Sequence, residues 1–395
     1  MLSNRALTIK PSPTLAVTAK AAQLKAEGKD IIGLGAGEPD FDTPDHIKAA
    51  AKKAIDDGFT KYTAVGGTVG LKNAVIAKLT RDNNLVYKPN EVVVGVGGKQ
   101  CIFNMILATI NPGDEVVIPA PYWVSYADIV EIAEGVPKLV FAGIEQGFKI
   151  TPAQLESAIT PKTKMFMINS PSNPTGAVYT QAELAALGEV LLKHPNIIVA
   201  TDDMYEHINL NDVPFVNIVN ACPALKDRAV VLNGVSKAYS MTGWRIGYAA
   251  GPARLIDTMT NLQSQSTSNP TSISQVAAEA ALNGDQSCLK PMVDAFKERN
   301  EFVFQGINSI PGLKANKAEG AFYSFVDARE AIKKLVAEGK LANSSDLLLA
   351  EYLLNAGVAV VPGSAFGAEG YFRISFATSM GNLEKAIARF KAALA

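Results

Sequence analysis

Short, almost wholly apolar segments alternate with amphipathic ones through the middle of the chain, from about residue 45 to 250. Each short segment ends in glycine, proline or polar residues, and they lie within 91–98, 111–121, 162–176, 196–206 and 229–239. A strand covered on both faces is apolar throughout, whereas in a strand with one solvent-exposed face apolar and polar residues alternate. The pattern therefore predicts a parallel or mostly parallel sheet between two layers of helices, which is an α/β architecture.

The C-terminal part of the chain has a different pattern. An amphipathic stretch at 296–308 predicts part of a long helix, and apolar strands and helices follow it up to the C-terminus. We expect this part to form a smaller α/β domain that the N-terminal segment completes. The predicted large domain covers 47–295, and the predicted small domain combines 1–46 with 296–395.

The composition indicates a soluble globular protein with a large core. Of the 395 residues, 48% are hydrophobic and 19% are charged, and the formal net charge is -1. The chain therefore has no excess of positive charge that would attract nucleic acid or an anionic membrane. No apolar run is long enough to span a bilayer, and the N-terminus has no secretory h-region. We therefore expect a cytoplasmic protein that binds small molecules.

The cysteines and histidines show no metal-ligand spacing. The three cysteines are far apart in the sequence, and so are the three histidines. We therefore expect no metal site, no disulfide and a reducing compartment.

The polar residues that suggest chemistry follow the predicted strands, where ligands bind in open α/β sheets. Lys237 comes after one such strand, among small and hydroxyl side chains in the sequence NGVSKAYSMTGWRIGY. A lysine in this setting can lose its proton and form a Schiff base with an aldehyde. Ser236 and Arg245 lie near it in the sequence, and both can bind a phosphate group. A solvated surface lysine is the weaker interpretation, because few such lysines follow an apolar strand directly.

Two other strand ends favour a ligand less strongly. Gly98 and Lys99 lie between a strand and a helix, where free amides bind phosphate well, although an ordinary turn fits equally. In the loop 169–176, prolines fix the direction of Asn173, whose side chain can donate to a phenolic oxygen or bind near a carboxylate. Taken alone, this loop is better explained as a simple turn.

Two charged residues are expected to be buried. Asp202 ends an apolar strand ahead of Tyr205, where it can pair with a protonated ring nitrogen or cap the next helix. Arg373 lies in YFRISFAT and needs an acidic partner, which is a protein acid or a substrate carboxylate. Taken alone, Arg373 favours the protein acid.

Together these residues suit one ligand, a planar aldehyde that carries a phosphate, a phenolic oxygen and a ring nitrogen. Pyridoxal 5′-phosphate (PLP) has all four groups; a lysine holds its aldehyde, and an aspartate pairs with its ring nitrogen. The joint pattern is far more specific than any one of its members.

The chain resembles the fold-type I PLP enzymes, and more closely the bacterial class I aminotransferases of the aspartate subgroup that includes aspartate/prephenate aminotransferases. The similarity runs almost end to end, through IKPSPT (9–14), GAGEPDFDTP (35–44), TKYTAVGG (60–67), VGGKQ (96–100), PYWVSY (121–126), SPSNPTG (170–176), DDMYEH (202–207), SKAYSMTGWRIGY (236–248) and FRISFA (372–377). The resemblance implies a mostly parallel seven-stranded sheet in the large domain, a homodimer, and ping-pong transfer of an amino group from L-aspartate to 2-oxoglutarate.

Matched motif by motif, the resemblance also implies the role of each candidate. The residues implied to hold the cofactor are Lys237 on the aldehyde, Asp202 on the ring nitrogen, Tyr205 and Asn173 on the phenolic oxygen, Trp123 against the ring, and Gly98, Lys99, Ser236 and Arg245 around the phosphate. Tyr62 is implied to reach the phosphate of the partner subunit's cofactor. Those implied to bind the substrate are Gly37, Trp123, Asn173 and Arg373 near its α-carboxylate, and Lys10 and Lys99 near a distal carboxylate.

Several alternatives stay open at this stage. Lys10 and Lys99 can instead be a solvated lysine and a support for the phosphate. The subgroup often has glutamate after the cofactor aspartate, whereas this chain has Asp203, which raises a question about packing behind the site. Prephenate is a plausible second substrate. An aromatic or alanine-type aminotransferase is the neighbouring alternative. A PLP-dependent carbon–sulfur lyase uses much the same cofactor residues, and a PLP-sensing regulator shares the fold but carries an added DNA-binding domain, for which the charge balance gives no support.

Overall fold

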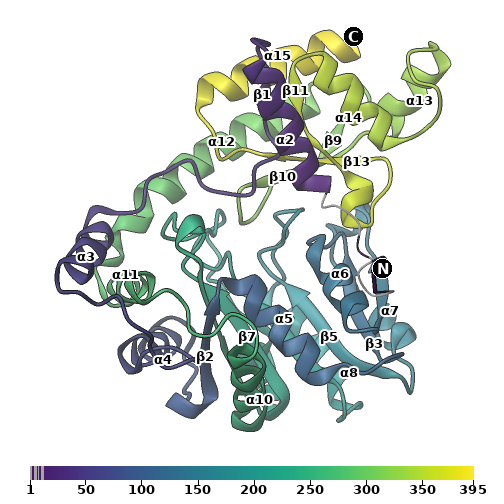
Figure 1. Cartoon of the computed structure of the whole chain (residues 1–395). Helices are drawn as coiled ribbons and strands as arrows, with labels where there is room; N and C mark the ends of the chain where they lie inside the picture. The colour runs from purple at the N-terminus through teal and green to yellow at the C-terminus, as the bar shows by residue number, and fades with distance from the viewer. Residues whose placement is uncertain (1, 4–6, 8, 10–12) are drawn as a thin grey trace.

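A seven-stranded sheet forms the centre of the larger part of the molecule (Figure 1). The computed structural model describes residues 2–3, 7, 9 and 13–395, without the side chains of residues 13–15. The strand order is β2-β8-β7-β6-β5-β3-β4. The strands are β2 (Val92–Val96), β3 (Glu115–Ala120), β4 (Val136–Phe141), β5 (Thr163–Asn169), β6 (Ile198–Asp202), β7 (Ala229–Gly234) and β8 (Ile246–Ala250). Only β8 runs antiparallel to its neighbours, which confirms the predicted mostly parallel sheet.

Helices cover both faces of this sheet, and the strand sequences reflect it. One layer includes α3 (Asp45–Asp56), α4 (Val69–Asn83), α7 (Pro152–Ala158), α8 (Gln181–Leu192), α9 (Ile218–Ala221) and α11 (Ser272–Asn283). The other includes α5 (Gly98–Thr109), α6 (Ser125–Ile132) and α10 (Ala253–Ser264). In β5, Phe166 and Ile168 pack in the first layer, whereas Met165 and Met167 pack in the second. The middle of such a strand is therefore apolar at consecutive positions, because alternate side chains enter two different cores.

Local sequence signals fix where several of these helices begin. The Thr180 hydroxyl accepts the Glu183 N–H at 3.2 Å, and the Glu183 carboxylate accepts the Thr180 N–H at 2.8 Å, which is a capping box at the start of α8. Thr151 and Gln154 form the same arrangement at the start of α7. Each box satisfies amides that have no partner within the helix.

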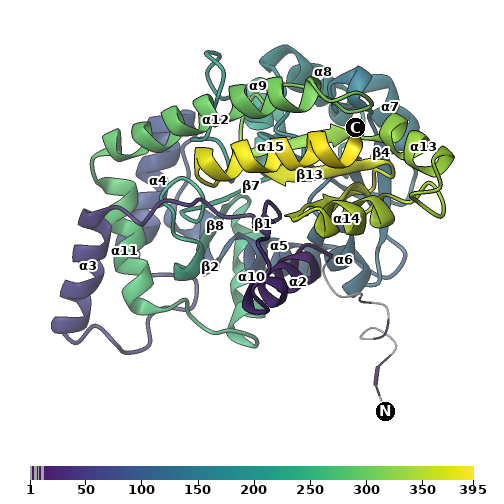
Figure 2. The same cartoon turned by 90° about the horizontal axis from the view of Figure 1, so that it is seen from above.

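The smaller part of the molecule combines the two ends of the chain. A four-stranded sheet has the order β12-β13-β10-β9. Its strands are β9 (Lys314–Ala315), β10 (Tyr323–Asp327), β12 (Val361–Pro362) and β13 (Tyr371–Ser375). Around it lie α12 (Lys290–Asn308), α13 (Arg329–Ala337), α14 (Asp346–Asn355) and α15 (Met380–Leu394). α12 contacts β9, β10 and α15. Seen from above, α15 lies over β13 (Figure 2), where Phe390 contacts Phe372.

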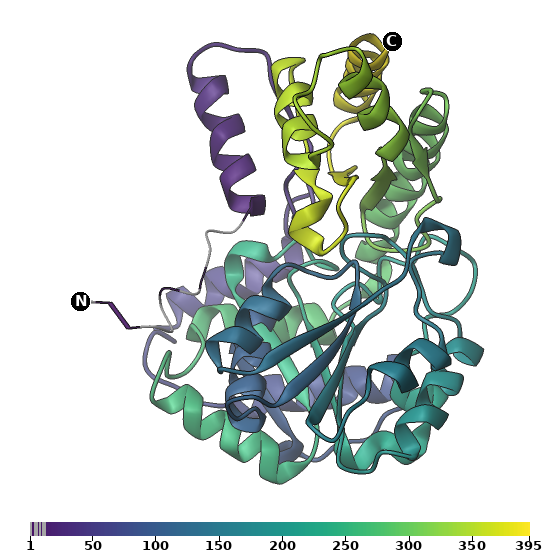
Figure 3. The same ribbon diagram turned by 90° about the vertical axis from the view of Figure 1, so that its right-hand side faces the viewer.

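The N-terminal segment completes this smaller part. α2 (Pro13–Ala26) lies beside the C-terminal elements in two views (Figures 1 and 3). β1 (Ile32–Gly33) pairs in parallel with β11 (Val358–Ala359). α12 extends across the predicted boundary between residues 295 and 296, and the boundaries themselves remain a prediction. In the described part of the chain, no helix has both the length and the hydropathy of a membrane span.

Candidate active site

A cavity of about 390 Å³ lies where the parallel strands end. Most of the residues predicted to bind cofactor or substrate line it together: Gly37, Gly98, Lys99, Trp123, Asn173, Asp202, Tyr205, Ser236, Lys237, Arg245 and Arg373. Asp202 is the last residue of β6, and Ser236 and Lys237 come directly after β7 and Val235. The carboxyl edge of the sheet therefore brings these side chains together, as the topology of an open α/β sheet predicts.

Tyr62 is the one described candidate residue that does not line this cavity. Tyr62 lies in the loop between α3 and α4, and 93% of it is exposed. Its predicted contact is with the cofactor of a partner subunit, so its position outside this chain's cavity leaves that prediction untested. Lys10 lies outside the described residues.

Asp202 is a buried carboxylate without a cationic partner. Its Oδ2 accepts the Tyr126 hydroxyl at 2.5 Å, and its Oδ1 accepts the Met204 N–H at 3.2 Å. No lysine, arginine or histidine of the described residues forms an ion pair with it. Burial raises the pKa of Asp202 above its ordinary value, although both hydrogen bonds oppose this change. A positively charged group in the cavity would therefore be strongly favoured beside it.

Lys237 offers an amine that loses its proton easily. Its Nζ donates to the carbonyl oxygen of Gly37 at 2.6 Å. Burial lowers its pKa to about 8, and Arg373 and Arg245 contribute to the decrease. Among the described residues, no carboxylate forms an ion pair that would hold its charge. At pH 8 about half of the amine is thus neutral, which is the nucleophilic form, whereas an ordinary lysine is almost fully charged at that pH.

The lowered pKa of Lys237 predicts a pH dependence of stability. Between about pH 8 and 10.5 the unfolded chain keeps this proton while the folded chain has lost it. Folding therefore becomes more favourable as pH rises through this window. We expect the free energy of unfolding of the ligand-free protein to gain on the order of 1–3 kcal/mol relative to Lys237→Met, with a discount because the amine faces an open cavity. Urea unfolding at several pH values measures this difference; parallel profiles for the two proteins would contradict it.

The end of the cavity near α5 suits an anion. Gly97 precedes α5 with a φ of 81°, and a side chain there would collide with the Arg245 guanidinium. Arg245 itself has a φ of 57°, which is uncommon for a residue with a side chain and indicates a functional constraint. Ser236 and the first turn of α5 line the same cavity. Hydroxyl, guanidinium and helix N-terminus together form a phosphate-binding arrangement.

Arg373 also lines the cavity, and it is unusual because its charged side chain is buried. Only 2% of it is exposed. Its Nη2 donates to the Gly35 carbonyl at 2.7 Å, and its Nη1 donates to Asn173 Oδ1 at 2.9 Å. Its Nε has no hydrogen-bond partner, and the guanidinium lies over the Tyr323 ring at 4.4 Å. Burial lowers its pKa below the ordinary value.

The interpretation of Arg373 as the partner of a protein acid is wrong. No carboxylate among the described residues forms an ion pair with Arg373. Its Nη1 and Nη2 instead donate to an amide oxygen and a backbone carbonyl oxygen. A buried guanidinium without a carboxylate leaves a charge uncompensated. The carboxylate of a bound molecule would supply the missing negative charge.

Three polar side chains of the cavity contact predicted residues but were not themselves predicted from the sequence. The Tyr126 hydroxyl binds Asp202, and the Tyr323 hydroxyl lies 3.0 Å from the Tyr205 hydroxyl. Asn169 joins two predicted residues, because it donates to the Asp202 carbonyl at 2.8 Å and accepts the Asn173 N–H at 2.8 Å. Tyr126 and Asn169 fall within or beside recognised motifs, which was a usable signal. Tyr323 lies in an apolar strand and gave none.

A buried polar cluster around Glu206 lies outside the cavity and connects two segments that carry cavity residues. Glu206 accepts the side-chain amides of Asn83 at 2.7 Å and Asn233 at 2.8 Å, and it pairs with the Lys78 ammonium. Asn233 belongs to β7, so the cluster ties the turn that follows Asp202 to the strand that leads to Lys237. Asp203, the departure from the usual glutamate, accepts the Thr201 hydroxyl at 2.6 Å and the Asn217 amide at 3.0 Å. The shorter acid is therefore fully satisfied.

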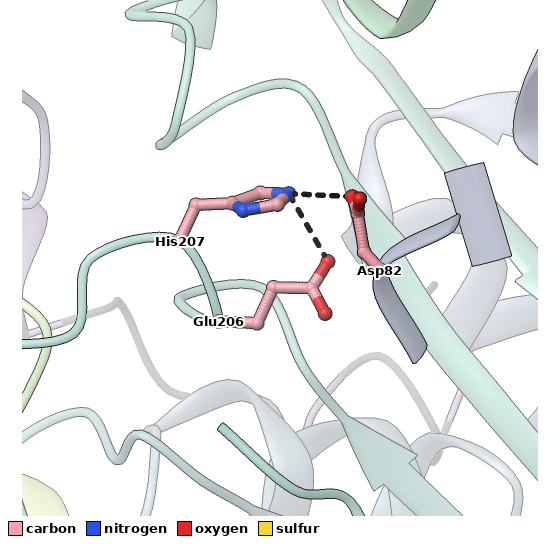
Figure 4. A group of neighbouring side chains, drawn as sticks. All are labelled: Asp82, Glu206 and His207. Carbon is pink, nitrogen blue, oxygen red and sulfur yellow. Dashed lines mark ion pairs between the residues drawn. The ribbon is translucent and has the colours of Figure 1, made fainter. Parts of the chain in front are cut away.

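The same cluster contains three side chains with metal-ligand atoms (Figure 4). His207 Nε2 lies 3.4 Å from both Asp82 Oδ2 and Glu206 Oε1. Lys78 already supplies positive charge there, since its ammonium contacts Glu206 and lies 3.9 Å from Asp82 Oδ2. Burial, together with Lys78, lowers the pKa of His207 to about 4, so its ring is neutral. We assign the cluster to structural support.

Comparisons with known proteins agree with this geometry. The family model for aminotransferase class I and II matches residues 29–390. An aspartate/prephenate aminotransferase of Nitrosomonas europaea is 66% identical over 100% of this chain and 99% of its own length, and one of Cereibacter sphaeroides is 55% identical over 99% and 98%. The crystal structure of the aspartate aminotransferase of Rhizobium meliloti superposes with a TM-score of 0.94 at 48% identity, covering 100% of this chain and 98% of that one. The chain belongs to the family of class I and II aminotransferases.

Proposed function

We propose that this chain is a PLP-dependent aminotransferase that moves the amino group of L-aspartate to 2-oxoglutarate. The observation that carries the proposal is one cavity with three unpaired groups: an amine of lowered pKa at Lys237, a buried carboxylate at Asp202 and a buried guanidinium at Arg373. Relatives with 66% and 55% identity bear the name aspartate/prephenate aminotransferase.

The cavity residues fit PLP group by group. Asp202 has the unpaired negative charge that a protonated ring nitrogen needs, and Lys237 has the amine that binds the aldehyde. Ser236, Arg245 and the first turn of α5 would hold the phosphate. Asn173 and Tyr205 would hydrogen-bond the phenolic oxygen. When bound, PLP supplies an electron sink that acidifies the Cα–H bond of the amino acid.

The protein residues then perform the remaining work. Arg373 binds the α-carboxylate of the substrate, with Asn173 and Gly37 beside it, so Cα is held near Lys237. Lys237 would be freed when the amino group of the substrate takes its place, and its amine would then take the proton from Cα as general base and deliver it again as general acid. Asp202 stabilises the protonated ring nitrogen by opposite charge. Release of one 2-oxo acid before the next one binds gives ping-pong kinetics.

Lys99 is the proposed partner of the distal carboxylate of a dicarboxylic substrate. Its ammonium lies 4.9 Å from the centre of the Trp123 ring, and the residue lines the cavity while remaining exposed. No carboxylate of the described residues forms an ion pair with it. Lys10 is proposed for the same role from the resemblance alone. With Arg373, these lysines would recognise two separated carboxylates, which suits aspartate, 2-oxoglutarate and also prephenate, whose amination gives arogenate.

Replacing Lys99 with methionine should weaken dicarboxylic substrates selectively. We expect kcat/KM for aspartate to fall about 10- to 100-fold, the usual effect of losing one hydrogen bond to a charged group. Values for alanine and phenylalanine should change less than threefold, because they have no distal carboxylate. Steady-state kinetics with the three amino acids measures this, and PLP affinity is the control. An equal loss for all three would contradict the assignment.

The proposed enzyme is a homodimer. Large exposed side chains cluster within residues 55–69: Ile55, Phe59, Tyr62 and Val69. Buried Gln275 holds the loop of Tyr62 in place, since it accepts the Thr68 N–H at 2.8 Å and donates to the Thr63 hydroxyl at 2.9 Å. A second copy would cover this surface and receive Tyr62 at its own phosphate site.

The test is the visible absorption spectrum of the purified protein before and after aspartate is added without a 2-oxo acid. We expect a cofactor band that changes while an equal amount of oxaloacetate appears; prephenate is then offered as amino acceptor. A band that persists while pyruvate and ammonia form from a thio-amino acid would favour the carbon–sulfur lyase. A protein that shows no band even after PLP is added would overturn the proposal.

A further inference from the structure

Tyr126 makes the closest hydrogen bond to the carboxylate of Asp202. Its hydroxyl donates to Asp202 Oδ2 at 2.5 Å, and both residues are buried. Tyr126 lies in α6, on a helix separate from the strand that carries Asp202. Its ring also meets the Trp123 ring edge-on, with 5.3 Å between the centres. One side chain thus contacts both the carboxylate and the indole of the cavity.

The surroundings of Asp202 leave few groups that can stabilise its charge. The other donor to its carboxylate, the backbone N–H of Met204, lies farther away at 3.2 Å. The titratable groups that influence Asp202, or are influenced by it, are Tyr126, Lys237, Tyr205, Asp203 and Cys101. Lys237 is the only cation in this set, and its amine contacts the Gly37 carbonyl instead. Burial holds the pKa of the Tyr126 phenol well above its ordinary value, so this group remains a donor.

We propose that Tyr126 is a positioning residue that keeps Asp202 ionised and fixes its orientation toward the ring nitrogen of PLP. The inference rests on the proposed function. Tyr126 itself is not the partner of the ring nitrogen: it acts through Asp202, because a buried carboxylate needs a strong donor to remain charged. Without the hydroxyl, Asp202 would retain one long backbone hydrogen bond and would take up a proton at a higher pH.

The test combines Tyr126→Phe with Asp202→Asn. The phenylalanine keeps the ring and its contact with Trp123, and it removes only the hydroxyl. PLP is removed from the purified protein and titrated back between pH 5 and 9, and its binding is followed by visible absorbance. Tyr179→Phe is the matched control, since Tyr179 is equally buried and its hydroxyl accepts the Ile150 N–H at 2.9 Å outside the cavity.

We expect Tyr126→Phe to weaken PLP binding at least tenfold at neutral pH, and to shift the acidic decline of affinity to higher pH. In the Asp202→Asn background the same change should cost less than twofold, because the group through which Tyr126 acts is gone. Tyr179→Phe should leave PLP affinity unchanged. An equal loss in both backgrounds, or an unmoved acidic decline, would overturn the role of Tyr126 while leaving the aminotransferase intact. Failure of the unaltered protein to bind PLP would overturn both.

Discussion

Replacing Lys237 with alanine should reduce aspartate transamination by roughly 10⁴-fold, the upper end of the range for a positioned acid–base group. In the proposed mechanism this one amine both holds the cofactor aldehyde and moves the Cα proton, and no second amine with the same surroundings lines the cavity among the described residues. Single-turnover measurements with aspartate, followed by oxaloacetate formation, test the effect. Near-normal transamination by this variant would contradict the proposed function.

Lys78 gives the matched control for Lys237. It is also buried, but its ammonium pairs with Glu206 and donates to Asn83 Oδ1 at 2.7 Å, away from the cavity. Lys78→Ala should therefore cost about 3–5 kcal/mol of stability, because it leaves a buried carboxylate unpaired. Lys237→Ala should not, since it removes an amine without a carboxylate partner. Urea unfolding measures the stability of both variants, and so shows whether Lys237→Ala loses activity because the base is missing or because the protein unfolds.

The hydrophobic pattern predicted five strands of the central sheet, β2, β3, β5, β6 and β7, but it did not predict β4 or β8. The apolar runs that became these five strands show little period-two alternation, because helices cover both sides of the sheet. The pattern did not predict that β8 (Ile246–Ala250) runs antiparallel. Strand direction depends on the short connection after β7, and no periodicity within a strand records it.

The candidate site was predicted mainly by position at strand ends and by motif resemblance. Lys237 and Asp202 both follow apolar strands, and topology brings them to one edge. The partners of buried charges were harder to predict, because they come from distant segments. The hydrogen bond from Tyr126 to Asp202 joins residues 76 positions apart, and that from Arg373 to Gly35 joins residues 338 positions apart. No local pattern connects such pairs.

Replacing Arg373 with methionine should lower kcat/KM for aspartate roughly 30-fold to several thousand-fold, because the substrate carboxylate would lose its buried partner. This factor corresponds to a loss of about 2–5 kcal/mol in transition-state stabilisation. Arg373→Lys should recover only part of this loss, since an ammonium keeps the charge but not the planar fork. Steady-state kinetics of the three proteins measures both effects.

The stability of Arg373→Met distinguishes a substrate-binding arginine from a structural one. In the ligand-free protein the guanidinium is buried without a carboxylate, and its Nε has no hydrogen-bond partner. Removing this charge relieves its uncompensated burial, but it leaves the acceptors of Gly35 and Asn173 without their donor. The free energy of unfolding should therefore change by less than about 2 kcal/mol, whereas breaking a buried ion pair would decrease it by about 3–5 kcal/mol. Lower catalytic efficiency with at most this small change in stability would therefore show that the buried charge serves the substrate. A strong loss of stability would mean that Arg373 holds the fold together, and the proposed carboxylate site would have to lie elsewhere in the cavity.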